Sequence, residues 1–299
     1  MRYAYYPGCS LTGTAREYDV STRALFSKLG IELEEIPDWT CCGASAVEPV
    51  SHLLTHVLPA RNLALAGHMQ DVQGVLIPCS ACYLNHLRVE MELDRDYERK
   101  NEVNEVLALE ELAYRGQEPR VIHLLQILNQ ADVLQELTQG TDQPLDKIQV
   151  APYYGCQILR PFARFDNPEY PQSMLAPLQA VQARIYPWHM GNKCCGASLM
   201  TTHKETALRD VGAILHQAQG ADVLVTVCPM CQMNLEGFQK QALHSYPDDQ
   251  HVPVLYLPQL LGLALGLGPK ELELEKNLQA GAFEHGLPHF ALRQEAITE

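Results

Sequence analysis

Short apolar runs and amphipathic stretches alternate along the whole chain of 299 residues. Residues 2–7 form a β-rich run, residues 16–30 carry apolar side chains at helical spacing, and residues 31–37 alternate apolar and acidic positions like a strand. Residues 52–69 predict a helix that is interrupted or kinked at its proline, and residues 72–78 predict a buried strand. Strands that alternate with helices are typical of parallel sheets with helical crossovers.

The same order of elements recurs in the second half of the chain. Residues 147–155, 180–188 and 221–227 are strand-like runs with polar or helical stretches between them. Residues 119–137 and 252–266 each add a further strand and helix to their half. Such self-similarity over half the chain length indicates an internal duplication.

A polar stretch separates the two halves. Residues 137–147 contain Gly and Pro among polar side chains and predict a linker. We therefore expect two tandem, pseudo-symmetric domains, residues 1–140 and residues 146–299. The predicted fold class is α/β, with a small, mainly parallel sheet and flanking helices in each domain.

The cysteines repeat in register with these elements. Ten are present, in two sets with the spacings C-x31-CC-x36-C-x2-C and C-x37-CC-x32-C-x2-C. The first set is Cys9, Cys41, Cys42, Cys79 and Cys82, and the second is Cys156, Cys194, Cys195, Cys228 and Cys231. Each group follows the carboxyl end of a predicted strand. We therefore expect three segments to meet at one sheet edge in each half, where sites of α/β sheets are built.

Composition narrows the classes of function. The net charge is −14, which argues against nucleic acid as the main partner because phosphate binding requires Lys and Arg. The first residues do not resemble a signal peptide, and no uninterrupted apolar stretch reaches the roughly 18 residues of a membrane span. We therefore expect a cytoplasmic protein, in which ten cysteines indicate metal binding or catalysis rather than disulfides.

Five cysteines in each half exceed the four that a structural zinc ion takes. Adjacent cysteines are awkward ligands for a single ion, but they can present two thiolates to different irons of one cluster. Buried free thiols, zinc with a spare cysteine in each half, and disulfides remain alternatives, and the matched sets favour iron–sulfur clusters. The glycine after each Cys-Cys pair, together with Gly8 and Gly155 before the first cysteine of each set, predicts a turn with positive φ.

These cysteine patterns resemble the B-type subunits of heterodisulfide reductase, within the wider family of cysteine-rich CCG-domain proteins. The resemblance covers essentially the whole chain, from "YYPGCS" to "LLGLALGLG", although the second copy has x32 where the family form has x35–36. It implies that each set of five cysteines ligates a non-cubane 4Fe–4S cluster. It also implies that the two clusters face each other across an interdomain cleft and split a disulfide in a two-electron reaction.

The resemblance further implies partner subunits. The chain has no ferredoxin-type cysteine run, and no flavin or nicotinamide motif such as G-x-G-x-x-G after a strand. By family precedent, we expect a C subunit with two cubane clusters and a flavin-containing A subunit to supply electrons. The resemblance implies that the substrate is a small disulfide, a thiol or a lipoyl protein. A lipoate-bound or other thiol or persulfide substrate would fit the sulfur-oxidising bacterial members of the family.

Two further predictions remain open. One alternative function is an electron-transfer or anchor subunit of a non-standard succinate:quinone reductase, although the chain has no strongly basic amphipathic stretch. Lys193 precedes the second Cys-Cys pair and His189 lies nearby, so either could neutralise a thiolate or supply a proton to the catalytic step. The alternative for both is an ordinary surface or packing role.

Overall fold

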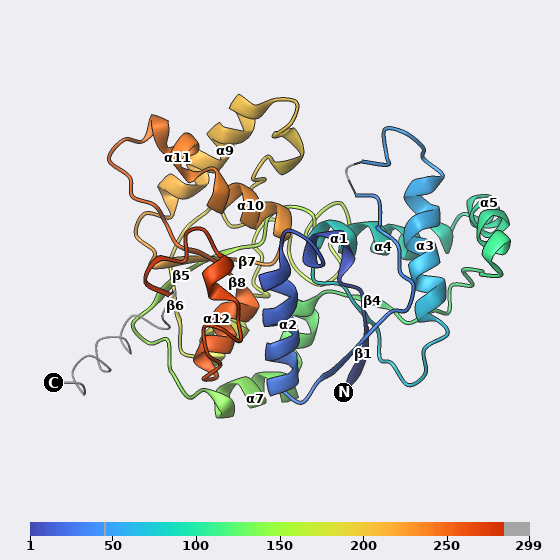
Figure 1. Ribbon diagram of the computed structural model, residues 1–299, viewed down its shortest axis with the longest axis horizontal. Helices are drawn as coiled ribbons and strands as arrows, with labels where there is room; N and C mark the ends of the chain where they lie inside the picture. Colours follow the sequence, from blue (N-terminus) through green and yellow to red (C-terminus); the bar gives the residue numbers. More distant parts are fainter. Residues whose placement is uncertain (45, 284–299) are drawn as a thin grey trace.

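A computed structural model of the protein describes residues 1–44 and 46–283. It contains two four-stranded sheets, in which every pair of neighbouring strands is parallel (Figure 1). The first sheet has the order β2-β1-β3-β4, with β1 at Arg2–Tyr5, β2 at Glu32–Glu35, β3 at Val75–Leu76 and β4 at Val121–Ile122. The second has the equivalent order β6-β5-β7-β8, with β5 at Gln149–Tyr153, β6 at Arg184–Ile185, β7 at Val223–Thr226 and β8 at Val254–Tyr256.

Helices connect and cover the strands. In the first half they are α1 (Gly8–Leu11), α2 (Arg16–Lys28), α3 (Leu54–Ala66), α4 (Ser80–Leu93), α5 (Tyr97–Leu107), α6 (Leu124–Leu128) and α7 (Ala131–Gly140). In the second half they are α8 (Leu175–Ala180), α9 (Lys204–Gln217), α10 (Pro229–Gly237), α11 (Gln239–Ala242) and α12 (Leu257–Ala264). Single 3-10 turns lie at Ala108–Glu110, Ala197–Leu199, Leu243–Ser245, Leu274–Lys276 and Gly281–Phe283. The predicted α/β class with two repeated parallel sheets is confirmed.

One helix was expected to be interrupted or kinked at its proline, and the interruption does not occur. α3 passes through Pro59 without interruption. Its buried side chains lie on both sides of the proline, including Val57 and Leu63, and the helix packs against α4 and α5. Tertiary packing therefore maintains the helix although the proline removes one backbone donor.

The two halves are packed together more closely than a polar linker suggests. α2 of the first half packs on α12 of the second (Figure 1). The rings of Tyr18 and Tyr256 stack with their centroids 4.1 Å apart. One hydrophobic cluster contains buried residues of both halves, and a second cluster lies within the second half. Within the stretch 137–147, α7 continues to Gly140 and Leu145 is fully buried, so this connection is part of the packed structure. The last part of the predicted second domain, residues 284–299, lies outside the described residues.

Among residues 1–44 and 46–283, no helix is both long enough and apolar enough to cross a bilayer.

Candidate iron–sulfur sites

The first set of cysteines converges at the carboxyl edge of the first sheet. Cys9 lies in α1 directly after β1, and Cys79 caps the N-terminus of α4 directly after β3. The Sγ atoms of Cys41 and Cys9 are 3.5 Å apart, and those of Cys42 and Cys82 are 3.2 Å apart. Three separate segments of the chain therefore bring their thiols to one place, as predicted from their positions after the strands.

The second set makes an equivalent arrangement. All five of its cysteines line one small cavity of about 40 Å³, whose other lining residues include no His, Asp or Glu. The Sγ atoms of Cys195 and Cys231 are 3.5 Å apart, and Cys228 caps the N-terminus of α10. Ser80 of the first half also lines this cavity.

Each site has a buried side and an open side. Cys42, Cys79 and Cys82 are buried in the first half, whereas Cys9 and Cys41 are exposed. In the second half, Cys195, Cys228 and Cys231 are buried, Cys156 is half-buried and Cys194 is exposed. A group held by these thiols would therefore be shielded from water on one side and accessible on the other.

The glycines beside the cysteines have the backbone conformation that the sequence predicts. Gly8, Gly43, Gly155 and Gly196 all have positive φ, between 68° and 75°. A Cβ on Gly155 would lie 3.0 Å from the Sγ atom of Cys231, and one on Gly8 would lie 3.2 Å from the Sγ atom of Cys82. These positions therefore need glycine both for the turn and for the close approach of a sulfur.

Hydrogen bonds between the thiols shift their pKa values in opposite directions, lowering the pKa of Cys194 and Cys228 and raising that of their partners Cys156 and Cys231. The hydrogen bond from Cys156 and the peptide N–H of Gly196 lower the pKa of Cys194 to about 6. Cys228 has its pKa lowered to about 7, chiefly by a hydrogen bond from Cys231 and also by peptide N–H groups of the first turn of α10. Helix N-termini favour negative charge in the same way. Because the thiolate is the form of cysteine that ligates metals, these features suit a metal-binding role.

Two pairs of supporting residues are related by the duplication and were not predicted from the sequence. The Asn85 side chain donates to the carbonyl of Cys42 at 3.1 Å, and the Asn234 side chain donates to the carbonyl of Cys195 at 3.0 Å. The sequence contains a signal for this pair, because in both halves the C-x-x-C motif is followed by an asparagine three residues later, as C-x-x-C-x-x-N. Each asparagine fixes the backbone of the second cysteine of a Cys-Cys pair.

The second pair consists of tyrosines. Tyr6 donates its hydroxyl to the carbonyl of Thr40 at 2.8 Å, and Tyr153 donates to the carbonyl of Lys193 at 2.7 Å. Both acceptors directly precede a Cys-Cys pair. Tyr6 is therefore the counterpart of Tyr153.

A buried hydrogen-bond network joins the two sites. The hydroxyl oxygen of Tyr18 is 3.0 Å from the carbonyl oxygens of both Pro78 and Val227, which directly precede Cys79 and Cys228. Ser80 donates to the Val227 carbonyl at 3.2 Å, and the Nε2 atom of His123 lies 3.2 Å from the Pro78 carbonyl oxygen. Burial lowers the pKa of His123 to about 3, so its ring is neutral at pH 7. The two cysteine sites are thus held beside each other.

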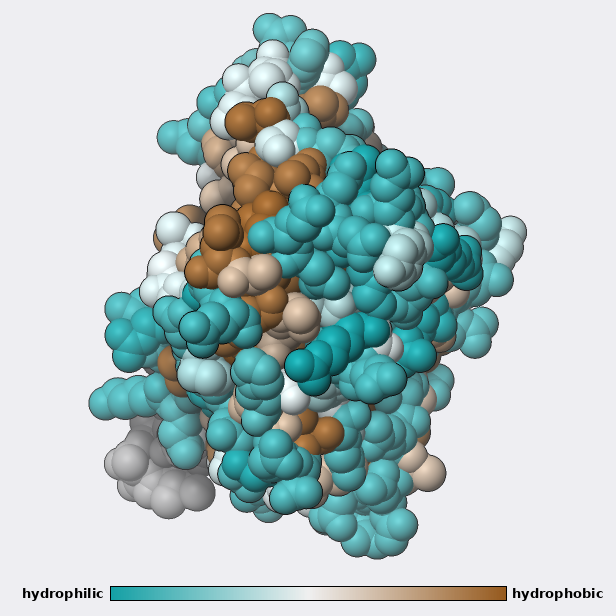
Figure 2. All heavy atoms as spheres, turned by 90° about the vertical axis from the view of Figure 1, so that its right-hand side faces the viewer, coloured by the Kyte–Doolittle hydropathy of each residue, from teal (hydrophilic) through white to brown (hydrophobic). Residues whose placement is uncertain are grey.

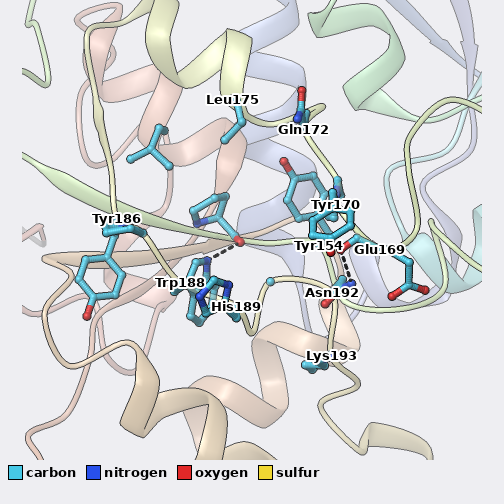
Figure 3. A pocket seen from close by; sticks show the side chains of 15 residues that line it. Tyr154, Glu169, Tyr170, Gln172, Leu175, Tyr186, Trp188, His189, Asn192 and Lys193 are labelled. Atoms are coloured by element: carbon cyan, nitrogen blue, oxygen red, sulfur yellow. Dashed lines mark hydrogen bonds between the residues drawn. The ribbon is translucent and has the colours of Figure 1, made fainter.

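Lys193 and His189 lie in a different cavity. Both line a pocket of about 460 Å³ on the second half, none of whose lining residues is a cysteine (Figure 3). Both side chains are exposed. The structure thus places them beside the second cysteine site rather than around its sulfurs, and their role in proton transfer stays a prediction.

The thiols fit iron–sulfur clusters by their chemistry. In residues 1–44 and 46–283, no group of three or more His, Cys, Asp or Glu side chains is arranged around one point as a single metal ion requires. A multi-iron cluster instead takes each thiolate at a different position on its surface, which suits five converging sulfurs. Glycine at positions 8 and 155 leaves room beside these sulfurs that any larger residue would occupy.

Comparisons with known proteins agree with this chemistry. The family model described as "Cysteine-rich domain" (CCG) matches residues 3–86 and again residues 150–236. The chain is 38% identical over 280 residues to the 8-methylmenaquinol:fumarate reductase membrane anchor subunit of Wolinella succinogenes, covering 92% of this chain and 96% of that protein.

Components of another enzyme are also similar. The chain is 28% identical over 291 residues to the B-type component of the ferredoxin/F(420)H(2)-dependent CoB-CoM heterodisulfide reductase of Methanosarcina acetivorans, covering 92% of this chain and 93% of that protein. A crystal structure of a hypothetical protein from Helicobacter pylori shares the fold, with a TM-score of 0.74 and 19% identity over 94% of this chain and 52% of that one. The chain therefore belongs to the cysteine-rich CCG-domain family, with one copy of the domain in each half.

Proposed function

We propose that this protein is the iron–sulfur subunit of an oxidoreductase complex, of either the quinone-linked or the heterodisulfide-reductase type, with one 4Fe–4S cluster, of the non-cubane type, in each half. The observation that carries the proposal is the convergence of five thiols in each half of the chain. The first set, Cys9, Cys41, Cys42, Cys79 and Cys82, would hold one cluster. The second set, Cys156, Cys194, Cys195, Cys228 and Cys231, would hold the other.

The residues of the chain prepare each site for electron transfer. An iron–sulfur cluster, when bound, exchanges one electron at a time. The buried cysteines and the helix N-termini surround the negatively charged thiolates with peptide dipoles, which tunes the potential of such a group. The exposed sulfurs of Cys9, Cys41 and Cys194 leave one side of each site open to a redox partner.

The proximity of the two sites suits two-electron chemistry. The Tyr18 hydroxyl contacts a backbone carbonyl in each half of the chain, one directly before Cys79 and one directly before Cys228. Two one-electron sites held beside each other match the two electrons of a disulfide, a fumarate or a quinone.

A quinone-linked complex of the fumarate or succinate reductase type is the first candidate for the assembly. The 38% identity to a menaquinol:fumarate reductase subunit over nearly its full length favours it. The chain would then pass electrons between a quinol and a flavin-containing catalytic subunit, on the cytoplasmic side of the membrane. Disulfide reduction with a two-cubane C subunit and a flavin-containing A subunit is the second candidate, favoured by relatives that are B-type components of heterodisulfide reductases.

An apolar surface supports assembly with partners. Figure 2 shows a strip of hydrophobic atoms between hydrophilic regions, on the side of the molecule where α5 lies. Contiguous apolar surface of this kind commonly marks contacts with other proteins or membranes.

Activity of the native complex decides between the two candidates. The complex is purified without oxygen by a tag on this chain, and is assayed with fumarate plus a reduced naphthoquinone and, separately, with a mixed disulfide plus a reduced viologen. The first candidate predicts fumarate-dependent oxidation of the quinol and no disulfide turnover, and the second predicts the reverse. A complex with full iron content that shows neither activity would overturn both.

A further inference from the structure

The pocket that contains Lys193 and His189 has aromatic walls (Figure 3). Its volume of about 460 Å³ is enclosed by the end of β5, the segment 169–175 and the segment 185–193. Tyr154, Tyr170, Tyr186 and Trp188 all line it. Planar aromatic side chains bind planar rings by stacking, so these walls suit a ring-shaped ligand better than a simple anion.

Hydrogen bonds fix the loops around this pocket. The indole N–H of Trp188 donates to the Pro152 carbonyl at 3.2 Å (Figure 3). The Asn192 amide donates to the carbonyls of Pro168 and Glu169 at 2.9 and 3.0 Å. A Cβ on Gly191 would lie 2.8 Å from the Pro152 carbonyl oxygen, so this close approach needs glycine. The pocket is therefore preorganised rather than formed by loose loops.

Two side chains at the pocket can donate hydrogen bonds to a ligand, and the pocket's carboxylate is paired with an arginine. The Glu169 carboxylate forms an ion pair with Arg160 at 2.7 Å, and this hydrogen bond lowers the pKa of Glu169. The exposed Lys193 ammonium and the His189 ring also line the pocket. Carbonyl oxygens on a ligand ring could accept hydrogen bonds from these two side chains.

One buried side chain connects this pocket to the second cysteine site. Tyr154 lines both the aromatic pocket and the small cavity formed by the five cysteines. Its side chain is 2% exposed, and its hydroxyl accepts a hydrogen bond from the Met174 N–H at 3.0 Å. In addition, Lys193 is adjacent in sequence to Cys194. A ring in the pocket would thus be separated from the second site by a single tyrosine side chain.

A second groove continues from the pocket. It has a volume of about 650 Å³ and lies between the halves, where Leu125 of α6 faces the segment 165–179. Gln172 and Leu175 line both cavities, so the two adjoin there. Phe165 and Ala176 add apolar surface to the groove, and Gln126, Asn129 and Asp166 add polar surface. Together, the two cavities form an aromatic pocket with polar groups and an adjoining groove that is partly apolar.

We propose that the aromatic pocket binds the head ring of a quinone, with the hydrocarbon tail lying in the adjoining groove. This inference rests on the proposed function and names its substrate site. Oxidation of a bound quinol releases two electrons and two protons. The cluster that the second cysteine set would hold could accept these electrons one at a time, and the protons would pass to water at the open side of the pocket.

Binding is measured directly, without turnover. The anaerobically purified holoprotein is titrated with 2-methyl-1,4-naphthoquinone by calorimetry, alongside the variants Tyr170→Ala and Tyr97→Ala. Tyr97 is a matched control, because both tyrosines are 78% exposed and Tyr97 lies on α5, away from the pocket. We expect Tyr170→Ala to weaken binding about tenfold, which corresponds to about 1.4 kcal/mol, and Tyr97→Ala to leave binding unchanged.

A second variant tests the tail groove. Leu175→Trp places a larger side chain where the two cavities adjoin, so it should weaken binding of a naphthoquinone with a two-isoprenoid tail more than binding of the tail-less ring. Equal binding by Tyr170→Ala and Tyr97→Ala, or no binding by protein with full iron content, overturns the quinone site alone. Protein without iron overturns the proposed function itself.

Discussion

The close approach of Gly155 to a cysteine sulfur allows a sharp test of the site geometry. Gly155 has a φ of +68°, and a Cβ added there would lie 3.0 Å from the Sγ atom of Cys231. Gly30 has nearly the same φ, +69°, but a Cβ there would meet no atom within 4 Å. The variants Gly155→Ala and Gly30→Ala therefore share the backbone cost and differ in the contact with the sulfur.

The magnitudes follow from these two terms. A non-glycine residue in the left-handed region costs about 1–2 kcal/mol, and the loss of unfolded-state entropy returns about 0.4–1 kcal/mol. We thus expect Gly30→Ala to lower the free energy of unfolding by about 1 kcal/mol. In Gly155→Ala, the Cys231 sulfur must also move by about 0.5 Å to reach an ordinary contact distance. Such a shift exceeds the tolerance of about 0.2 Å for metal–ligand distances.

Iron content and thermal unfolding separate the two effects. We expect both variants to unfold about 2 °C below the wild type in the metal-free state. Gly30→Ala should keep its full iron, whereas Gly155→Ala should lose about half of it, because only the second site is disturbed. The geometric reasoning is refuted if Gly155→Ala binds as much iron as Gly30→Ala.

Three further predictions concern individual side chains. Asn234→Ala should lower the free energy of unfolding, measured with denaturant, by about 1–2 kcal/mol, and should reduce the iron content of the second site only. Asn85→Ala should have the same effects at the first site. Equal iron loss at both sites would contradict this prediction. Tyr18→Phe should lower the free energy of unfolding by about 1–2 kcal/mol, because the Val227 and Pro78 carbonyls each keep a second donor. A decrease above about 4 kcal/mol in denaturant unfolding would contradict this hydrogen-bond network. Burial raises the pKa of Glu236 to about 7, so the folded state holds a proton that the unfolded state has lost, and stability should fall as pH rises from about 4.5 to about 7. Glu236→Gln should therefore be more stable than the wild type at pH 8 but not at pH 4.5, and identical pH profiles in urea titrations would count against this.

The strands, the helices and the cysteine clusters could be predicted because local pattern determines them. The helix over residues 16–30 has one apolar face and a glycine end, and it forms α2 within two residues of the prediction. The parallel order of the strands then brings each cysteine group to the same sheet edge. Positive φ at Gly8 and Gly155 followed from their place in tight turns.

The contacts between the halves could not be predicted in the same way. The stacking of Tyr18 on Tyr256 depends on how one repeat packs against the other, which no local pattern encodes. Likewise, of the interruption or kink expected at Pro59, the interruption does not occur, because packing on α4 and α5 outweighs the local effect of the proline. Lys193 is adjacent to Cys194 in sequence, yet its side chain lines the aromatic pocket, because the chain turns there, with the Lys193 N–H donating to the Met190 carbonyl at 3.1 Å.

The content of iron and acid-labile sulfide in anaerobically purified protein tests the central claim most directly. Two 4Fe–4S clusters predict about eight irons and eight sulfides per chain, and conversion of all ten cysteines to serine should abolish both. Stoichiometric zinc without iron in freshly isolated native protein would contradict the account and leave a duplicated zinc-binding scaffold.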